Sequence, residues 1–328
     1  MPERNDHQGI VARGVRRAFG DVVAVDHIDL DAPPGEVTAL VGPNGAGKTT
    51  LLLVLATLLV PDAGTVSIAG HDPVTEPRAV RARVGWMPDV FGTWETLTCR
   101  EVLRTVSDAF RLPRSVSGPR IDELLALVHL TELADRPTQV LSRGQKQRLG
   151  LARALVHDPD VLLLDEPASG LDPRSRIELR GIVRGLAAQG KAVLVSSHVL
   201  AELDEMADRA VIVARGRTVA TEVLGEGSPG ALYGRPGTAG ATAAGVPGQT
   251  RTWRVRALDA DALQAALRGF ERRAEPAGRD TVEVQVASDA DAADLLADLV
   301  GAGVRVVAFQ PSAGALEQAY LALTEDRR

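Results

Sequence analysis

The chain has 328 residues, of which 45% are hydrophobic and 24% are charged, as is typical of globular proteins. This length indicates about two domains, and the formal net charge of −6 argues against a general nucleic-acid-binding protein, because such proteins usually carry a basic excess. The single cysteine, Cys99, excludes an intrachain disulfide. A membrane-spanning helix is not expected, because it needs about 20 mostly apolar residues and the longest apolar run is much shorter.

Residues 9–222 alternate short apolar runs with helical patterns, which predicts an α/β domain built on a largely parallel sheet. The longest apolar run, Leu51–Val60, is closed by a proline and predicts a buried helix. Residues 223–250 are rich in Gly, Pro, Ala and Thr and predict a flexible linker. In the first domain we expect strands at residues 37–41, 161–164, 192–196 and 211–213.

Residues 251–328 form a second, smaller α/β unit with its own pattern. Alternating and helical periodicities predict the order βαββαβ followed by one more helix. This order is typical of a ferredoxin-like split βαβ unit. The expected elements are strands at 253–257, 270–275, 281–286 and 304–309, and helices at 260–268, 290–300 and 315–323.

A glycine-rich sequence of the form G-x-x-x-x-G-K-T directly follows the strand expected at residues 37–41 in the first domain. Glycines let a loop wrap closely around a phosphate, so that backbone N–H groups and the N-terminus of the next helix face the anion. Lys48 adds a positive charge at the β and γ phosphates, and the Thr49 hydroxyl is a ligand for Mg²⁺. The motif predicts a nucleotide site formed by Gly42, Pro43, Asn44, Gly45, Ala46, Gly47, Lys48, Thr49 and Thr50.

Two acids, Asp165 and Glu166, end the apolar strand at 161–164. A strand that is apolar throughout is buried on both faces, and its C-terminal end is where open α/β sheets bind ligands. We expect Asp165 to hold Mg²⁺ through a water molecule and Glu166 to polarise the attacking water. These features indicate an enzyme that acts on Mg-nucleotides, either a phosphohydrolase or a kinase.

The segment Leu141–Gln145 (LSRGQ) resembles the LSGGQ signature of the ATP-binding cassette (ABC) ATPases, with Arg143 in place of the first glycine. Residues 9–220 contain the other motifs of this family in the family's order. The resemblance implies that the signature contacts the phosphate of ATP held by a second subunit. The residues concerned are Ser142, Arg143, Gly144 and Gln145.

Further positions match the same family. Phe19 corresponds to the aromatic residue that stacks on adenine, and Ser169–Asp172 to the D-loop that links the two sites of a dimer, with Asp172 at the nucleotide. Ser196–His198 corresponds to the switch histidine at the γ-phosphate. Asp89 stands where many members have a glutamine: it can still ligate Mg²⁺, but it adds negative charge and donates no hydrogen bond.

The resemblance implies a P-loop ATPase fold with a mostly parallel sheet core, an antiparallel β subdomain and an α-helical subdomain. It also implies ATP and Mg²⁺ as ligands, a second ATPase subunit as partner, most simply a second copy of the chain, and no nucleic acid. Trp94 and Phe91 are expected at the surface for a separate transmembrane permease, on the cytoplasmic face of the membrane. The tail Leu316–Thr324 is similar to that of exporter ATPases of the daunorubicin-resistance type, which suggests export.

Three alternatives stay open on the sequence. A cassette ATPase that acts on ribosomes or DNA is disfavoured by the presence of one cassette, the lack of a long coiled-coil insertion and the acidic charge. A small-molecule kinase would leave the signature and His198 without a role. The third alternative is a non-enzymatic regulator whose ATP hydrolysis is impaired by Asp89, and a measured rate of ATP turnover would separate it from an active ATPase.

Overall fold

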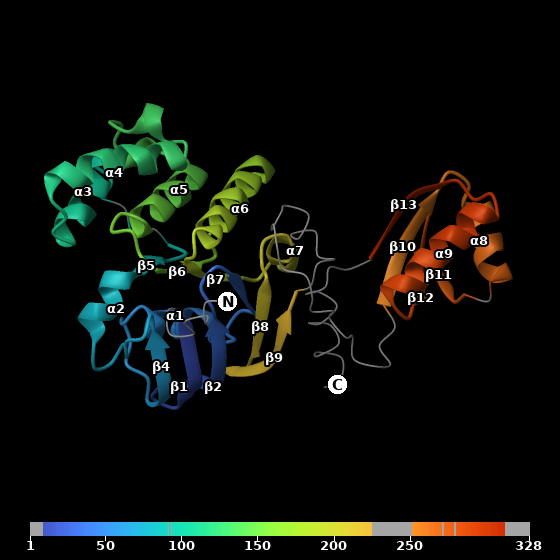
Figure 1. Ribbon diagram of the computed structural model, residues 1–328, viewed down its shortest axis with the longest axis horizontal. Coiled ribbons are helices and arrows are strands. Elements are labelled where there is room, and N and C mark those ends of the chain that lie inside the picture. The colour runs from blue at the N-terminus through green and yellow to red at the C-terminus, as the bar shows by residue number, and fades with distance from the viewer. Residues whose placement is uncertain are drawn as a thin grey trace, which may run out of the picture. The chain divides into compact units, whose positions relative to one another are not determined.

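The computed structural model describes residues 9–90, 92, 94–224, 251–270, 272–278 and 280–311. The chain divides into two compact units, Met1–Leu224 and Gly225–Arg328, which are described separately (Figure 1). The predicted linker lies outside the described residues except for its first two positions, and Val223 is the last residue of a strand.

The first unit is built on a nine-stranded mixed sheet of order β4-β1-β2-β9-β8-β3-β7-β6-β5. The strands β5, β6, β7, β3 and β8 are parallel neighbours, whereas β4, β1 and β2 pair antiparallel and β9 pairs antiparallel with β8. The predicted P-loop α/β fold with an antiparallel subdomain is confirmed. The strands are β1 (Ile10–Phe19), β2 (Val22–Ala32), β3 (Val37–Val41), β4 (Ala63–Ile68), β5 (Val84–Met87), β6 (Val161–Asp165), β7 (Ala192–Ser197), β8 (Arg209–Ala214) and β9 (Arg217–Val223).

Seven helices accompany this sheet in the described part of the first unit: α1 (Lys48–Leu55), α2 (Pro77–Arg83), α3 (Cys99–Ala109), α4 (Arg114–Leu127), α5 (Arg143–Ala154), α6 (Pro173–Ala188) and α7 (Leu200–Asp204). In Figure 1, α3 and α4 lie together on the side away from β4, β1 and β2. They form the predicted helical subdomain. None of the described helices is long and apolar enough to cross a membrane.

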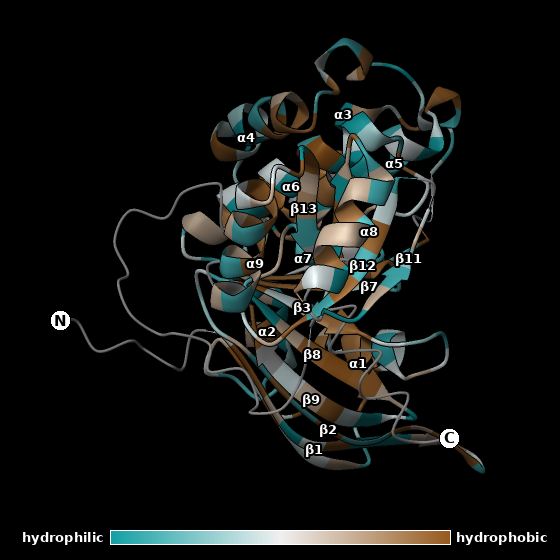
Figure 2. Ribbon diagram, turned by 90° about the vertical axis from the view of Figure 1, so that its right-hand side faces the viewer, coloured by the Kyte–Doolittle hydropathy of each residue, from teal (hydrophilic) through white to brown (hydrophobic). Residues whose placement is uncertain are grey.

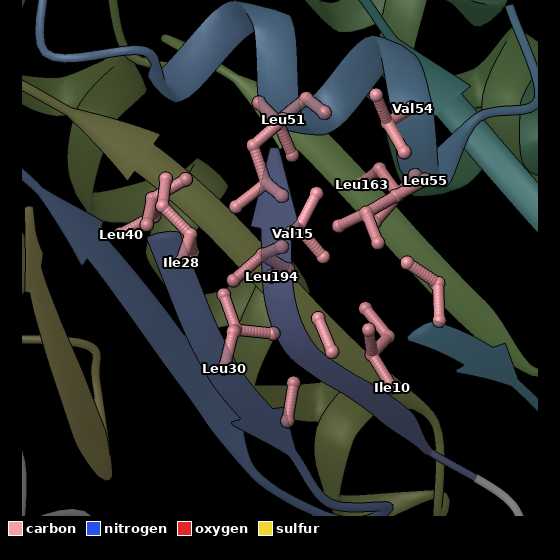
Figure 3. Close-up of a cluster of buried hydrophobic side chains, with 14 of the residues drawn as sticks. Ile10, Val15, Ile28, Leu30, Leu40, Leu51, Val54, Leu55, Leu163 and Leu194 are labelled. Atoms are coloured by element: carbon pink, nitrogen blue, oxygen red, sulfur yellow. The ribbon is translucent and has the colours of Figure 1, made fainter. Parts of the chain in front are cut away.

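The main core lies between α1 and the strands, where apolar side chains from both layers interdigitate (Figure 3). Strands β3, β6 and β7 are buried along their whole length, which explains their mostly apolar sequences. Leu51, Val54 and Leu55 of α1 face this core, and the helix is brown along most of its length in Figure 2. The core therefore fixes α1 against the strand ends that carry the polar residues described below.

The prediction of one buried helix over Leu51–Val60 is wrong in its second half. Helix α1 ends at Leu55, and Leu58 and Val60 are exposed. Thr57 adopts a positive φ of 62°, in the left-handed region, which breaks the helical path before Pro61. The chain turns here to enter β4.

The helical subdomain is held by caps and ion pairs at the start of α3. Thr98 forms a capping box with Glu101. Arg100 contacts Asp122 on α4 at 2.5 Å and Asp135 in the following segment at 3.0 Å. Helices α3 and α4 alternate between brown and teal in Figure 2, as expected for helices with one buried face.

A partly buried histidine, His157, packs against the end of α3. The His157 ring stacks on Phe110 with centroids 3.8 Å apart, and its Nε2 lies 3.0 Å from the carbonyl oxygen of Val84. A carbonyl only accepts hydrogen bonds, so Nε2 carries the proton and donates. Burial lowers the pKa of His157 below its ordinary value.

We expect the stability of the first unit to fall as the pH drops from 7 to 5, because His157 must take up a proton that the unfolded chain binds at higher pH. The stabilisation is complete above the unfolded pKa and is lost as the pH falls through the lower folded pKa. His157→Gln should flatten this dependence, which melting curves at several pH values would measure. A change of 1 kcal/mol in the free energy of unfolding shifts the melting temperature by about 2–4 °C. His27→Gln, at an exposed position, is the control; an equal effect from it would contradict the role of His157.

The second unit is a four-stranded antiparallel sheet of order β11-β12-β10-β13 with two helices. The chain order βαββαβ and this strand order confirm the ferredoxin-like prediction. The predicted strand at 270–275 is displaced, because Phe270 caps α8 and the strand begins at Ala274; the predicted final helix lies outside the described residues. The elements are β10 (Arg251–Ala257), α8 (Ala260–Gly269), β11 (Ala274–Pro276), β12 (Thr281–Val286), α9 (Asp289–Gly301) and β13 (Val306–Pro311).

Candidate nucleotide site

The loop between β3 and α1 has the conformation that its glycines predict. Gly45 and Gly47 take positive φ values of 80° and 98°. A Cβ at Gly47 would lie 2.4 Å from the carbonyl oxygen of Ala24, so no larger residue fits there. Gly47 is the N-cap of α1 and no side chain caps this helix. The first N–H groups of α1 are therefore available to an anion.

Lys48 is buried at the start of α1, and its ammonium group lies over the loop. Its Nζ donates to the carbonyl oxygens of Gly42 at 2.7 Å and Pro43 at 3.3 Å. Burial lowers the pKa of Lys48, against the opposing negative charges of Glu166 and Asp165. The Lys48 ammonium therefore lies near the carboxylates of Glu166 and Asp165.

The Thr49 hydroxyl and the Asp165 carboxylate meet at the C-terminal end of β6. Thr49 Oγ1 donates to Asp165 Oδ2 over 3.0 Å, and Ser196 Oγ on β7 donates to Asp165 Oδ1 over 2.5 Å. Asp165 is only 2% exposed. Each of its two carboxylate oxygens accepts a hydrogen bond from a neighbouring hydroxyl, as buried polar groups require. The parallel register of β6 and β7 pairs Asp165 with Ser196 and explains this contact.

Glu166 and His198 face each other beside this group. His198 Nδ1 lies 2.9 Å from Glu166 Oε2, with the histidine exposed to solvent. Glu166 has a positive φ of 48°, and its backbone N–H donates to the carbonyl oxygen and the hydroxyl of Ser196 at 3.1 and 3.2 Å. The turn directs the carboxylate toward His198 and holds it there.

The signature turn, Ser142–Gln145, begins α5. Ser142 is the N-cap and forms a capping box with Gln145 in which each side chain bonds the other's backbone N–H, at 3.2 and 2.9 Å. Arg143 Nη2 donates to Ser169 Oγ over 2.9 Å. The turn thus contacts the loop Ser169–Asp172, here termed the 169–172 loop.

Asp172 ends this loop and caps α6 (Pro173–Ala188). Its carboxylate accepts from the backbone N–H of Ser175 at 3.0 Å and from the Ser175 hydroxyl at 2.7 Å. These bonds hold the pKa of Asp172 below its usual range. The observed role of this side chain is to cap a helix.

Phe19 and Asp89 lie at separate positions around these groups. Phe19 is 46% exposed, with the Arg17 guanidinium 4.9 Å from the ring centroid, so it does not pack into the core. Asp89 is exposed, and its carbonyl oxygen accepts from Gln147 Nε2 at 3.4 Å. A cavity of about 230 Å³ beside it is lined by Asp89, Val90, Arg143, Lys146 and Gln147.

The structure therefore brings Lys48, Thr49, Asp165, Glu166 and His198 to one end of three parallel strands, and it places the signature turn beside the 169–172 loop. Sequence reasoning gave no role to Ser196, to Ser169 as a partner of Arg143, or to Arg17 beneath Phe19. The register of β6 and β7 pairs Ser196 with Asp165, but this pairing can be predicted only once the two strands are known to be neighbours.

Comparison with known proteins decides the family. The ABC transporter family matches residues 25–169. The daunorubicin resistance ATP-binding protein DrrA3 of Streptomyces coeruleorubidus is 41% identical over 211 residues, which span 64% of this chain and 67% of that protein. The chain belongs to the ABC transporter family. The Nod factor export ATP-binding protein I of Burkholderia orbicola (strain AU 1054) is 40% identical over 220 residues, spanning 67% of this chain and 71% of that protein.

Solved structures of ABC cassettes share the fold. An ATP-binding subunit of an ABC transporter superimposes with a TM-score of 0.62 at 28% identity, covering 66% of this chain and 90% of that one. A dimeric ABC transporter cassette, MJ0796, gives 0.59 at 26% identity, covering 66% and 98%. This ABC protein is accordingly an ATP-binding subunit and an ATPase, of a family that acts as dimers together with a membrane permease.

Proposed function

We propose that this ABC protein hydrolyses MgATP at the interface of two copies and drives export through a separate permease. The observation that carries the proposal is the cluster Lys48, Thr49, Asp165, Glu166 and His198 at one end of the parallel strands. Export is supported by the relatives, one of them named for Nod factor export and one for daunorubicin resistance.

The residues present fit Mg²⁺. This ion prefers hard oxygen ligands, few of them from protein, with the rest supplied by water and phosphate. Thr49 Oγ1 and Asp165 Oδ2 are two such oxygens, 3.0 Å apart and beside the loop between β3 and α1, residues 42–47, here termed the phosphate loop. Thr49 and, through water, Asp165 would hold the ion, with Asp89 as a further oxygen ligand. When bound, Mg²⁺ supplies positive charge that neutralises the phosphates.

The chain's own groups perform the rest of the mechanism. The backbone N–H groups of residues 44–47 and the N-terminus of α1 bind the phosphates, and Lys48 moves its ammonium from the carbonyl oxygens of its loop to the β and γ oxygens. Phe19 offers an exposed ring face to adenine. Glu166 accepts a hydrogen bond from the attacking water, and His198 orients Glu166 and contacts the γ-phosphate.

A second copy completes each site. The signature turn of one subunit, Ser142, Arg143, Gly144 and Gln145, faces the ATP held by the phosphate loop of the other, with Asp172 beside it. Hydrolysis removes the γ-phosphate contacts that hold the two copies together. The ATPase domain at 9–222 is followed in the chain by residues 223–250 and by the ferredoxin-like unit at 251–328, which is proposed as a regulatory or dimerising domain.

The permease is proposed to contact the surface formed by Trp94 and Val140, on the cytoplasmic side of the membrane. Both side chains are exposed, and their segments lie side by side, because Thr138 Oγ1 donates to the carbonyl oxygen of Trp94 over 2.9 Å. Exposed apolar side chains on two adjacent segments are typical of a surface that binds another protein. Phe91, also predicted here, lies outside the described residues.

Cysteine cross-linking tests this surface. Cys99 is buried, and burial raises the pKa of its thiol, so the natural chain has no reactive thiol at neutral pH. Trp94→Cys is expected to cross-link to a membrane protein with several spanning helices in intact membranes. Val74→Cys, at a similarly exposed residue of the β4–α2 connection, should not. Equal cross-linking at both positions, or none at residue 94, would contradict the proposed surface.

A further inference from the structure

Arg143 is the one signature residue that departs from the family pattern, and its side chain has a defined partner. Besides its hydrogen bond to Ser169 Oγ, it crosses Gly170: a Cβ at Gly170 would lie 2.6 Å from Arg143 Nε and 3.0 Å from its Cζ. Gly170 also has a positive φ of 72°. Both the backbone conformation and the close approach of Arg143 therefore disfavour a side chain at this position. The guanidinium thus lies against two successive residues of the 169–172 loop.

The 169–172 loop is in turn attached to Glu166. The backbone N–H of Ser169 donates to the carbonyl oxygen of Glu166 over 3.0 Å, and that of Leu171 donates to Ala168 over 3.1 Å. A continuous path of short contacts therefore runs from Arg143 through Ser169 to Glu166. A glycine at position 143 has no side chain to form its first link.

An apolar contact also joins the turn and the loop. A Cβ at Gly144 would lie 3.1 Å from Leu171 Cδ2, which places this leucine against the turn. Apolar packing of this kind is not directional. The guanidinium, with a fixed planar set of donors, adds a contact that specifies one arrangement of the two segments.

We propose that Arg143 is a positioning residue that ties the signature turn to the 169–172 loop within one subunit. The inference rests on the proposed function, in which the signature turn serves the ATP of the partner copy while Glu166 serves the ATP of its own. Arg143 then links the two sites of the dimer, because a movement of the turn is passed to the segment that carries Glu166. The consequence is steeper cooperativity in ATP hydrolysis.

The test is the ATP dependence of steady-state hydrolysis by the full chain, in saturating Mg²⁺. Arg143→Gly and Ser169→Ala should each lower the Hill coefficient toward about 1 and lower kcat about threefold to tenfold, with little change in KM. The double variant should be no worse than Arg143→Gly, because both substitutions remove the same contact. Arg143→Lys should restore part of the cooperativity, because an ammonium group can still donate to Ser169.

Lys146→Ala is the matched control, since it removes a cation from the same helix without removing the hydrogen bond to Ser169. It should leave the Hill coefficient unchanged. Ser169→Ala deletes a single oxygen and is a mild change for the fold, and retained ATP binding would verify folding of each variant.

Three results would overturn the inference. Strictly additive effects of the two substitutions would show that they do not act through one contact. A raised KM from Arg143→Gly, with Ser169→Ala harmless, would make Arg143 a direct ligand of the nucleotide. Unchanged kcat and Hill coefficient in both variants would leave Arg143 without a positioning role. Loss of hydrolysis in Glu166→Gln would then show that the proposed function holds even though the inference about Arg143 fails.

Discussion

Glu166→Gln is expected to lower the kcat of ATP hydrolysis by about 10²- to 10⁴-fold while ATP binding persists, since general bases contribute about this much. The amide has nearly the shape of the carboxylate, but it cannot take a proton from water. The hydrogen bond to His198 can be kept, because the amide oxygen still accepts at the position of Oε2. Binding is retained because the phosphate loop and Lys48 are untouched.

The same variant should accumulate an ATP-bound dimer, because the γ-phosphate that joins the two copies is not removed. Size-exclusion chromatography with and without MgATP would detect it. Glu123→Gln, which neutralises an exposed acid paired with Arg120 on α4, is the control and should change neither turnover nor dimerisation. Hydrolysis at the natural rate in Glu166→Gln would exclude Glu166 as the base.

Asp165→Asn is expected to lower hydrolysis at least about 10²-fold and to raise the Mg²⁺ concentration that gives half-maximal activity. The carboxylate is buried and accepts from the hydroxyls of Thr49 and Ser196 through its two oxygens. An amide replaces one of these acceptors with a donor, so the O–H of one hydroxyl loses its acceptor, at a cost of about 1–3 kcal/mol in the free energy of unfolding. The variant should therefore also melt at a lower temperature.

The two effects separate by titration. Activity measured against Mg²⁺ at saturating ATP reports the metal site, and melting in the absence of nucleotide reports the hydrogen bonds. Asp160→Asn, directly before the start of β6 and in an exposed ion pair with Arg83, should affect neither measurement appreciably. A Mg²⁺ dependence that is unchanged in Asp165→Asn would move the metal site elsewhere.

Much of the molecule follows from local sequence. Strand β3 was predicted with its observed bounds, and β6 and β7 within one residue, because strands buried on both faces must be apolar throughout. The βαββαβ order of the second unit followed from alternating periodicities in the same way. The phosphate loop could be located because its glycines, Lys48 and Thr49 are contiguous in the chain.

What could not be predicted depends on tertiary position or on single backbone angles. The end of α1 is set by the left-handed conformation of Thr57, which an apolar sequence does not signal. The contact of Ser196 with Asp165 requires the knowledge that β6 and β7 are neighbours. In the sequence, Arg143 is notable only because it replaces a glycine of the LSGGQ pattern. Its partner Ser169 lies 26 positions away, so their contact cannot be predicted from local sequence.

The left-handed backbone of Glu166 places a conformational cost at the residue proposed as the catalytic base. A non-glycine residue in that conformation loses about 1–2 kcal/mol relative to the right-handed region. Glycine would remove this cost, but it would also remove the carboxylate, so the turn cannot be optimised for folding and for turnover at once. The hydrogen bonds from the Glu166 N–H to Ser196 keep the strained turn in place. Selection for thermal resistance alone would favour losing this glutamate, whereas selection for turnover retains it.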